Sequence, residues 1–195
     1  FRFVALPPTN LADLVERRLV DLKALVPQLV RLNIAEAETP IIEVTESTKG
    51  FYKVYDEIAS LPEGSDFCVI EVRSALKDEL SILSKEELNS FFSRIVKREI
   101  QTKAIFTEES LLEPRKQLAA ENMSLLEQRI FHVRVLPEAV LPFQDLMLIY
   151  GDKIAFLFPE SSLVVAIGHR RIAQAMRTLF ETLFVLGRPI KEPWK

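Results

Sequence analysis

The sequence has few residues of the kinds on which cofactor sites and catalytic centres commonly depend. Five glycines in 195 residues leave no place for a glycine-rich dinucleotide fingerprint or phosphate-binding loop. The two histidines and the single cysteine form no metal-ligand spacing, and no Ser-His-Asp set is visible. We therefore expect no cofactor, no bound metal and no enzymatic activity.

Neither an excess of positive charge nor a long apolar run is present. The net charge of −3 argues against nucleic-acid binding by this chain alone, because such binding needs unpaired lysines and arginines that displace counterions from phosphates. No apolar stretch approaches the length of a membrane span, so we expect no membrane contact. Cys68 lies in an apolar run and cannot form an internal disulfide, which fits a reducing, cytoplasmic location.

The N-terminal segment, residues 1–36, reads as a short strand followed by a long helix. Asn10 and Asp13 are typical of a helix start, because they can accept hydrogen bonds from its free N–H groups. Arg18 interrupts an apolar seam at heptad spacing, formed by Leu11, Val15, Leu22, Leu25, Leu29 and Leu32. Either the helix lies across its own domain, or it forms a coiled coil with a second copy. We predict the coiled coil, and with it a homodimer.

The remaining chain, residues 37–195, alternates strand and helix patterns and then becomes rich in strands. The predicted strands are 41–45, 66–72, 102–107, 129–136, 146–150, 153–158 and 163–168. The predicted helices are 49–61, 84–98, a weaker one near 111–121, and 170–186. Ser84 and Glu87 form a capping box, and Gly151-Asp152 is a hairpin turn. The pattern predicts an α/β fold with a mixed sheet, tending to α+β in the C-terminal half.

Four segments in this order resemble the C-terminal part of TrmB-like transcriptional regulators. They are FRFVALPPTNLADLVERRLVDLKALVPQL (1–29), PIIEVTESTKGFYKVYDEI (40–58), VRVLP with LMLIYGDKIAFLF (133–158), and IAQAMRTLFETLF (172–184). The resemblance implies a dimerisation helix followed by a phospholipase D-like, effector-sensing domain. The family's DNA-reading winged helix is missing, so the resemblance places DNA contact upstream of Phe1. The sugar-binding domain of the longer members is missing too, and sugar recognition is carried over to no residue.

The stretch FQDLMLIYGD has the spacing of the H-x-K-x4-D motif of phospholipase D-like enzymes, but none of its chemically competent residues. Phe143, Asp145 and Tyr150 stand at the positions of the histidine, lysine and aspartate. A phosphodiesterase of this type needs the histidine to attack phosphorus and the lysine to neutralise the oxygens. Whether the stretch is a lost active site or an ordinary hairpin, we expect it to be non-catalytic.

The two histidines lie outside that spacing. His132 shares a strand face with Arg134 and is expected to be structural. The triplet His169-Arg170-Arg171 stands at a helix start, where positive charge opposes the helix dipole. Either an anion or an acidic partner lies there, or the side chains are simply solvated, which we favour.

Polar residues follow two of the predicted strands. Glu71, Arg73 and Ser74 end one strand, and Thr107 and Glu108 end the next. Ligands of open α/β sheets collect outside the carboxyl ends of strands, so we predict that any effector binds there. The alternative is an internal Glu71–Arg73 pair with helix capping by Ser110.

These observations favour the dimerisation and effector-sensing part of a DNA-binding transcriptional regulator, with a small-molecule effector. A stand-alone protein-interaction or scaffold module is the alternative. An enzyme with a relocated phosphodiesterase site rests on the resemblance in fold alone.

Overall fold

The computed structural model describes residues 18–19, 23, 39–141, 145–191 and 193. The chain divides into two compact units, Phe1–Pro40 and Ile41–Lys195. In the first unit, the described residues Arg18, Leu19 and Lys23 are helical and exposed. The predicted dimerisation residues lie outside the described residues, namely Leu11, Val15, Leu22, Leu25, Leu29 and Leu32.

The second unit is built on one mixed sheet of eight strands. The order is β1-β7-β6-β5-β2-β3-β4-β8, and only the pairs β2/β3 and β3/β4 are parallel. The strands are β1 (Ile41–Glu46), β2 (Asp66–Glu71), β3 (Gln101–Phe106), β4 (Phe131–Val135), β5 (Leu146–Tyr150), β6 (Lys153–Phe158), β7 (Leu163–Gly168) and β8 (Arg188–Ile190). All seven strands predicted from the sequence are present, and the mixed α/β class is confirmed.

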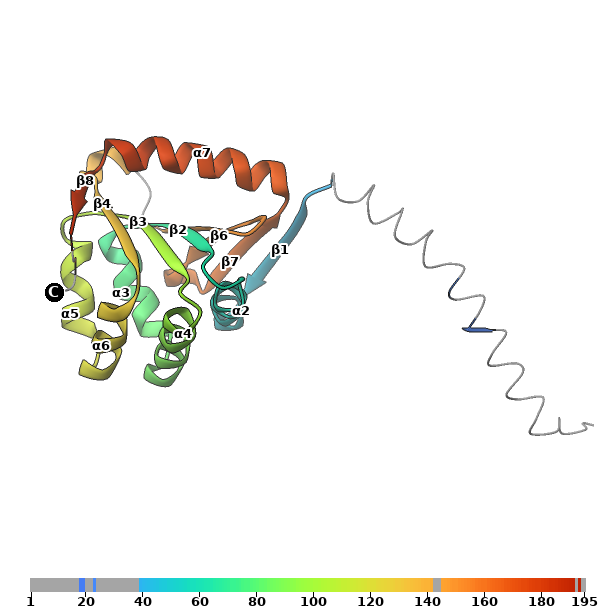
Figure 1. The fold of residues 1–195 in the computed structure, drawn as a ribbon, viewed down its shortest axis with the longest axis horizontal. Helices are drawn as coiled ribbons and strands as arrows, with labels where there is room; N and C mark the ends of the chain where they lie inside the picture. Colours follow the sequence, from blue (N-terminus) through green and yellow to red (C-terminus); the bar gives the residue numbers. More distant parts are fainter. Residues whose placement is uncertain (1–17, 20–22, 24–38, 142–144, 192, 194–195) are drawn as a thin grey trace, which may run out of the picture. The chain divides into compact units, whose positions relative to one another are not determined.

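Helices cover both faces of this sheet. Figure 1 shows α7 (Arg170–Leu186) across one face and the other helices on the opposite face. Those helices are α2 (Thr48–Ala59), α3 (Arg73–Ile82), α4 (Lys85–Lys97), α5 (Glu113–Gln117) and α6 (Ala120–Gln128). Among the described residues, no helix has both the length and the apolar content needed to cross a bilayer. The core between these layers is apolar and fully buried at its centre, for example at Phe51, Ile105 and Phe180.

Local sequence explains why several elements begin and end where they do. The Ser84 side chain accepts a hydrogen bond from the Glu87 N–H at 3.2 Å, and the Glu87 carboxylate accepts one from the Ser84 N–H at 2.9 Å. This capping box starts α4 as predicted. Gly151 has φ +50° in the turn between β5 and β6, a conformation that glycine adopts without strain. The predicted hairpin is therefore confirmed.

Two sequence predictions need correction, and two elements, helix α3 and strand β8, were not predicted. Residues 72 and 73 were assigned to a strand and its end, but β2 stops at Glu71 and Arg73 opens α3. The N-cap Val72 makes no side-chain cap bond, so the sequence carries no start signal there. The weaker helix near 111–121 is two helices, α5 and α6, separated by Leu118 and Ala119. The short strand β8 was not predicted, because Pro189 is untypical of strands except at a sheet edge, where β8 lies.

Candidate ligand-binding site

The parallel strands β2 and β3 end side by side, and their ends are joined by buried hydrogen bonds. Thr107 Oγ1 and Ser110 Oγ are 2.8 Å apart, and Ser110 Oγ donates to the backbone carbonyl of Glu71 at 3.3 Å. Thr107 and Ser110 are both buried. Two of the residues predicted to bind an effector, Glu71 and Thr107, are thus brought together through Ser110, in a network that binds the strand ends to each other.

The other predicted effector residues do not join this network in the described structure. Glu108 is exposed and forms an ion pair with Arg188 of β8. Arg73 and Ser74 lie in the first turn of α3, and their side chains are outside the described residues. The suggested Glu71–Arg73 pair therefore also falls outside what the structure describes.

Of the positions that match the H-x-K-x4-D spacing, Tyr150 has a side chain that is engaged elsewhere. Tyr150 is buried and donates a hydrogen bond to Glu57 Oε2 at 2.9 Å. Lys153 holds the same carboxylate at 2.9 Å. Burial raises the pKa of Asp145, and the neighbouring charge of Glu160 raises it further. Phe143 lies outside the described residues. Tyr150 and Glu57 thus form part of a structural ion-pair cluster.

The two histidines have local structural partners. His132 Nε2 lies 3.2 Å from Gln101 Oε1 on the neighbouring strand. His169 is the N-cap of α7, and its Nδ1 accepts a hydrogen bond from the Ile172 N–H at 3.3 Å. Within the described residues, no group of histidine, cysteine, aspartate and glutamate side chains could hold a metal ion.

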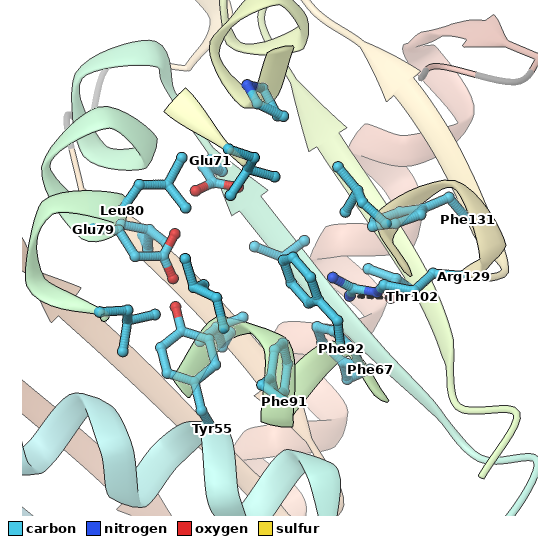
Figure 2. Close-up of a pocket in the computed structure, with 18 of the residues that line it drawn as sticks. Tyr55, Phe67, Glu71, Glu79, Leu80, Phe91, Phe92, Thr102, Arg129 and Phe131 are labelled. Carbon is cyan, nitrogen blue, oxygen red and sulfur yellow. Dashed lines mark hydrogen bonds between the residues drawn. The ribbon is translucent and has the colours of Figure 1, made fainter. Parts of the chain in front are cut away.

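A cavity of about 80 Å³ lies between the sheet and the helices that cover it opposite α7. Its wall is mostly apolar and aromatic, and includes Phe67, Leu83, Phe91, Phe92, Phe106, Phe131, Leu146 and Leu148. Besides Thr102, four polar side chains line it: Tyr55 of α2, Glu71 at the end of β2, Glu79 of α3 and Arg129 between α6 and β4. Figure 2 shows the oxygens of Tyr55 and Glu79 directed toward the same part of this space.

Arg129 enters the cavity between aromatic rings. Its guanidinium carbon lies 4.4 Å from the ring centroid of Phe131, 5.0 Å from that of Phe92 and 5.5 Å from that of Phe91. These distances allow cation–π attraction, which is strongest where water is excluded. One of its terminal nitrogens donates to Thr102 Oγ1 at 3.0 Å. Rings and hydroxyl together fix the guanidinium and leave its Nε free of a partner within the described residues.

Burial dominates the ionisation of the two glutamates. Glu71 is 5% exposed and Glu79 is 7% exposed. Loss of hydration raises the pKa of each carboxyl to about 8, and the positive charge of Arg129 only partly opposes this rise. At neutral pH both carboxyls are therefore mainly protonated. The same burial lowers the pKa of Arg129, yet a guanidinium remains cationic at neutral pH.

Several polar atoms of this cavity lack partners. Within the described residues, Tyr55 Oη, Glu71 Oε1 and Arg129 Nε are buried and make no hydrogen bond. Buried polar groups are almost always hydrogen-bonded, so three unpartnered atoms around one void indicate a bound molecule or ordered water. The arrangement offers a fixed cation, two carboxyls and a hydroxyl inside an apolar wall. That combination suits binding and orientation of a small polar molecule.

Sequence reasoning found only one of these four polar residues. Glu71 was chosen for its place at a strand end, whereas Tyr55 fell within the predicted helix 49–61 and was not singled out as a site residue. A tyrosine on the apolar face of a helix buries a hydroxyl that needs a hydrogen-bond partner. This requirement is the sequence signal that could have identified Tyr55. Glu79 and Arg129 come from segments 50 residues apart in the numbering, and only the folded chain places them around one cavity.

No protein-family model and no curated protein matches this sequence. Solved structures with a similar fold include TrmBL2 and NucT. TrmBL2, an archaeal chromatin protein described as showing a novel mode of DNA binding, is 15% identical, with a TM-score of 0.50; the alignment covers 93% of this chain and 67% of TrmBL2. NucT from Helicobacter pylori is 8% identical, with a TM-score of 0.53; the alignment covers 77% of this chain and 99% of NucT. At these identities the likeness concerns the fold alone.

Proposed function

We propose that Ile41–Lys195 is a non-catalytic, ligand-sensing domain of a DNA-binding transcriptional regulator. The observation that carries this proposal is the cavity with its unpartnered buried atoms Tyr55 Oη, Glu71 Oε1 and Arg129 Nε. A purely structural core gains nothing from such atoms, because each costs about 1–3 kcal/mol when it is left unpaired. A binding site uses them when its ligand arrives.

The regulatory part of the proposal is supported by fold and sequence together. The fold resembles that of TrmBL2, which is described as a chromatin protein that binds DNA. Three of the four sequence segments that resemble TrmB-like regulators, which begin at residues 40, 133 and 172, cover parts of Ile41–Lys195, and the remaining one, 1–29, precedes it. In this proposal DNA contact belongs to a winged helix upstream of Phe1 in the parent polypeptide. The helix at 10–33 joins two copies, and ligand binding alters the spacing of their DNA-reading elements.

The non-catalytic part is supported by the chemistry of the motif positions. Phe143 and Asp145 supply neither a nucleophile nor a cation for a phosphate. Tyr150 is held by Glu57 in a structural cluster. We expect no hydrolysis of a generic phosphodiester such as bis-p-nitrophenyl phosphate above a buffer blank. Hydrolysis abolished by His132→Ala or His169→Ala would instead establish a relocated active site.

DNA binding by the parent polypeptide tests the proposal. Fluorescence anisotropy with duplex DNA should show binding by the parent that weakens steeply as salt is raised, because counterions are released from the phosphates. The 195-residue chain, with its net charge of −3, should show no binding under the same conditions. A parent polypeptide that does not bind DNA would leave the scaffold alternative in its place.

A further inference from the structure

The cavity holds groups of opposite charge type that do not contact each other. Within the described residues, no ion pair or hydrogen bond joins Arg129 to Glu71 or Glu79. Among the described residues, the Arg129 side chain bonds to Thr102 Oγ1, and Glu71 Oε1 has no hydrogen-bond partner. Because both carboxyls are mainly neutral at pH 7, the buried charge of Arg129 has no anion beside it, which is costly. A ligand placed between the guanidinium and the carboxyls would supply that anion.

We propose that this cavity binds a small α-amino acid, with its carboxylate on Arg129 and its ammonium group on the carboxyls of Glu71 and Glu79 and the hydroxyl of Tyr55. The inference rests on the proposed sensing function and names the class of ligand. It follows from the two kinds of group present at the site. A ligand with only an anionic end leaves two buried carboxyls unused, and one with only a cationic end leaves the guanidinium unused.

The anion end of the site is already oriented. The rings of Phe91, Phe92 and Phe131 and the hydroxyl of Thr102 hold the guanidinium in place. Its unpartnered Nε–H is a buried donor next to the void. Arginine binds carboxylates through parallel N–H donors, so a ligand carboxylate completes the bonding of this side chain.

The cation end has acceptors from three elements. Glu71 of β2, Glu79 of α3 and Tyr55 of α2 all line the cavity. An ammonium group has three donors and needs three acceptors when it is buried. These three side chains supply that number. The Glu71 Oε1 and Tyr55 Oη atoms, unpartnered among the described residues, gain the partners that they lack.

The size of the cavity limits the ligand. An engineered cavity of about 150 Å³ accommodates the six carbon atoms of benzene, so one of about 80 Å³ holds roughly three non-hydrogen atoms without rearrangement. Glycine has five non-hydrogen atoms and alanine has six, so the wall must move outward for either of them to enter. The apolar wall beside the polar groups suits a methyl side chain, and a larger side chain requires a larger movement. We therefore take L-alanine as the reference probe.

Binding must also move a proton. In the empty site near pH 7 the two carboxyls are mainly neutral and Arg129 is cationic, since burial raises the pKa of each carboxyl to about 8. An ammonium group stabilises an ionised carboxylate beside it. One carboxyl therefore loses its proton to the buffer when the zwitterion enters, and about one proton is released per ligand.

The test is isothermal titration calorimetry of the 195-residue chain with L-alanine, propionate and ethylamine. The last two probes lack the amine and the carboxylate respectively. We expect L-alanine to bind and both fragments to bind at least about tenfold more weakly, because propionate leaves the buried carboxyls without a donor and ethylamine leaves the guanidinium without an anion. Titrations in phosphate and in Tris, which differ in ionisation enthalpy, should report the proton release.

Variants connect binding to the named residues. Glu79→Gln keeps the shape of a mainly protonated carboxyl but cannot ionise, so it should fold and lose at least about tenfold in affinity for L-alanine. Arg129→Lys should lose affinity as well. Glu127→Gln changes an exposed carboxylate two positions before Arg129 and serves as the matched control, with no effect expected.

Three results would overturn the inference. They are no binding of glycine, L-alanine or L-valine at millimolar concentration, propionate binding as tightly as L-alanine, and full L-alanine affinity in Glu79→Gln. The first would assign the cavity to ordered water, and the second to a simple carboxylate. Failure of the wider function is seen separately, because DNA binding by the parent polypeptide is measured without any amino acid.

Discussion

Two tyrosines on the same face of the sheet show how differently a buried hydroxyl can be satisfied. Tyr150 donates to Glu57 at 2.9 Å, whereas Tyr55 has no hydrogen-bond partner among the described residues although its ring packs edge-on against Phe91 with centroids 4.9 Å apart. A bonded hydroxyl contributes to folding and an unbonded one opposes it. The second hydroxyl therefore has to be explained by something other than stability.

Removing each hydroxyl should separate these roles. Tyr55→Phe should leave the free energy of unfolding unchanged within about 0.5 kcal/mol, or raise it, because no bond is lost. Tyr150→Phe should lower it by about 1.5–3 kcal/mol, because a hydrogen bond to a carboxylate is lost. Urea unfolding followed by circular dichroism measures both. An equal loss in the two variants would mean that Tyr55 has a partner in the ligand-free protein, such as a bound water.

The two buried glutamates should make the protein less stable as pH rises. Their pKa values are raised to about 8 in the folded protein, above the ordinary value of 4.5. Between these values the unfolded chain has lost protons that the folded chain retains, so the stabilisation present at low pH is lost as pH rises toward 8. The slope is about 1.4 kcal/mol per pH unit for each carboxyl that stays protonated.

Urea unfolding between pH 5.5 and 7.5 measures this slope. The charged group that faces the two carboxyls across the cavity is Arg129, which stays cationic in this range. A Glu71→Gln and Glu79→Gln double variant should have a flatter profile than the wild type. The interpretation is wrong if both profiles have the same slope.

At the level of elements, the sequence predicted those whose signals are local. The capping box of Ser84 and Glu87 and the Gly151 turn depend on residues that are close together in the sequence. The sequence therefore predicted α4 and the β5–β6 hairpin. Helix α3 starts without a side-chain cap, and β8 exists through its pairing with β4. Both depend on tertiary contacts, which local patterns do not contain.

The residues of the candidate site also divide into one that a local sequence pattern marks and others that only tertiary packing brings to the site. Glu71 was found because parallel strands end together at one edge of a sheet. Glu79 belongs to the helix that was missed, and Arg129 lies just before a strand where nothing marks it as buried. Tertiary packing alone brings them to the cavity. The sequence therefore predicted a site at the strand ends, but the polar groups that line the cavity lie between the sheet and the helices that cover it.

The contact of α2 with the sheet depends on one glycine. A Cβ at Gly50 would lie 3.0 Å from the Cβ atoms of Thr45 and Val164, which cannot move without their strands. Gly50→Ala should lower the free energy of unfolding by about 1 kcal/mol, since overpacking of about 1–3 kcal/mol exceeds the gain in helix propensity of about 1 kcal/mol. Urea unfolding measures the change.

Gly168→Ala is the control for that substitution. A Cβ at Gly168 meets nothing closer than 3.8 Å, so this variant should be as stable as the wild type. Equal losses in both variants would show that the close approach of α2 to β1 and β7 is not what requires Gly50.

For the whole molecule, the proposed signal requires that two copies be joined. The seam that predicts a coiled coil includes Leu22 and Leu29, which lie outside the described residues. Leu22→Asp with Leu29→Asp places four carboxylates in the seam of a dimer and should make the 195-residue chain monomeric at micromolar concentration. Analytical ultracentrifugation decides this. A double variant that stays dimeric would show that this helix does not hold the dimer together.

The most direct test of the central claim is the affinity of the parent polypeptide for its DNA, measured with and without L-alanine. The wild type should change its DNA affinity by about 5- to 150-fold, the range typical of coupled sites, and Glu79→Gln should show no change. A wild type whose DNA affinity is the same with and without the amino acid, at concentrations that fill the cavity, would contradict a sensing role for Ile41–Lys195.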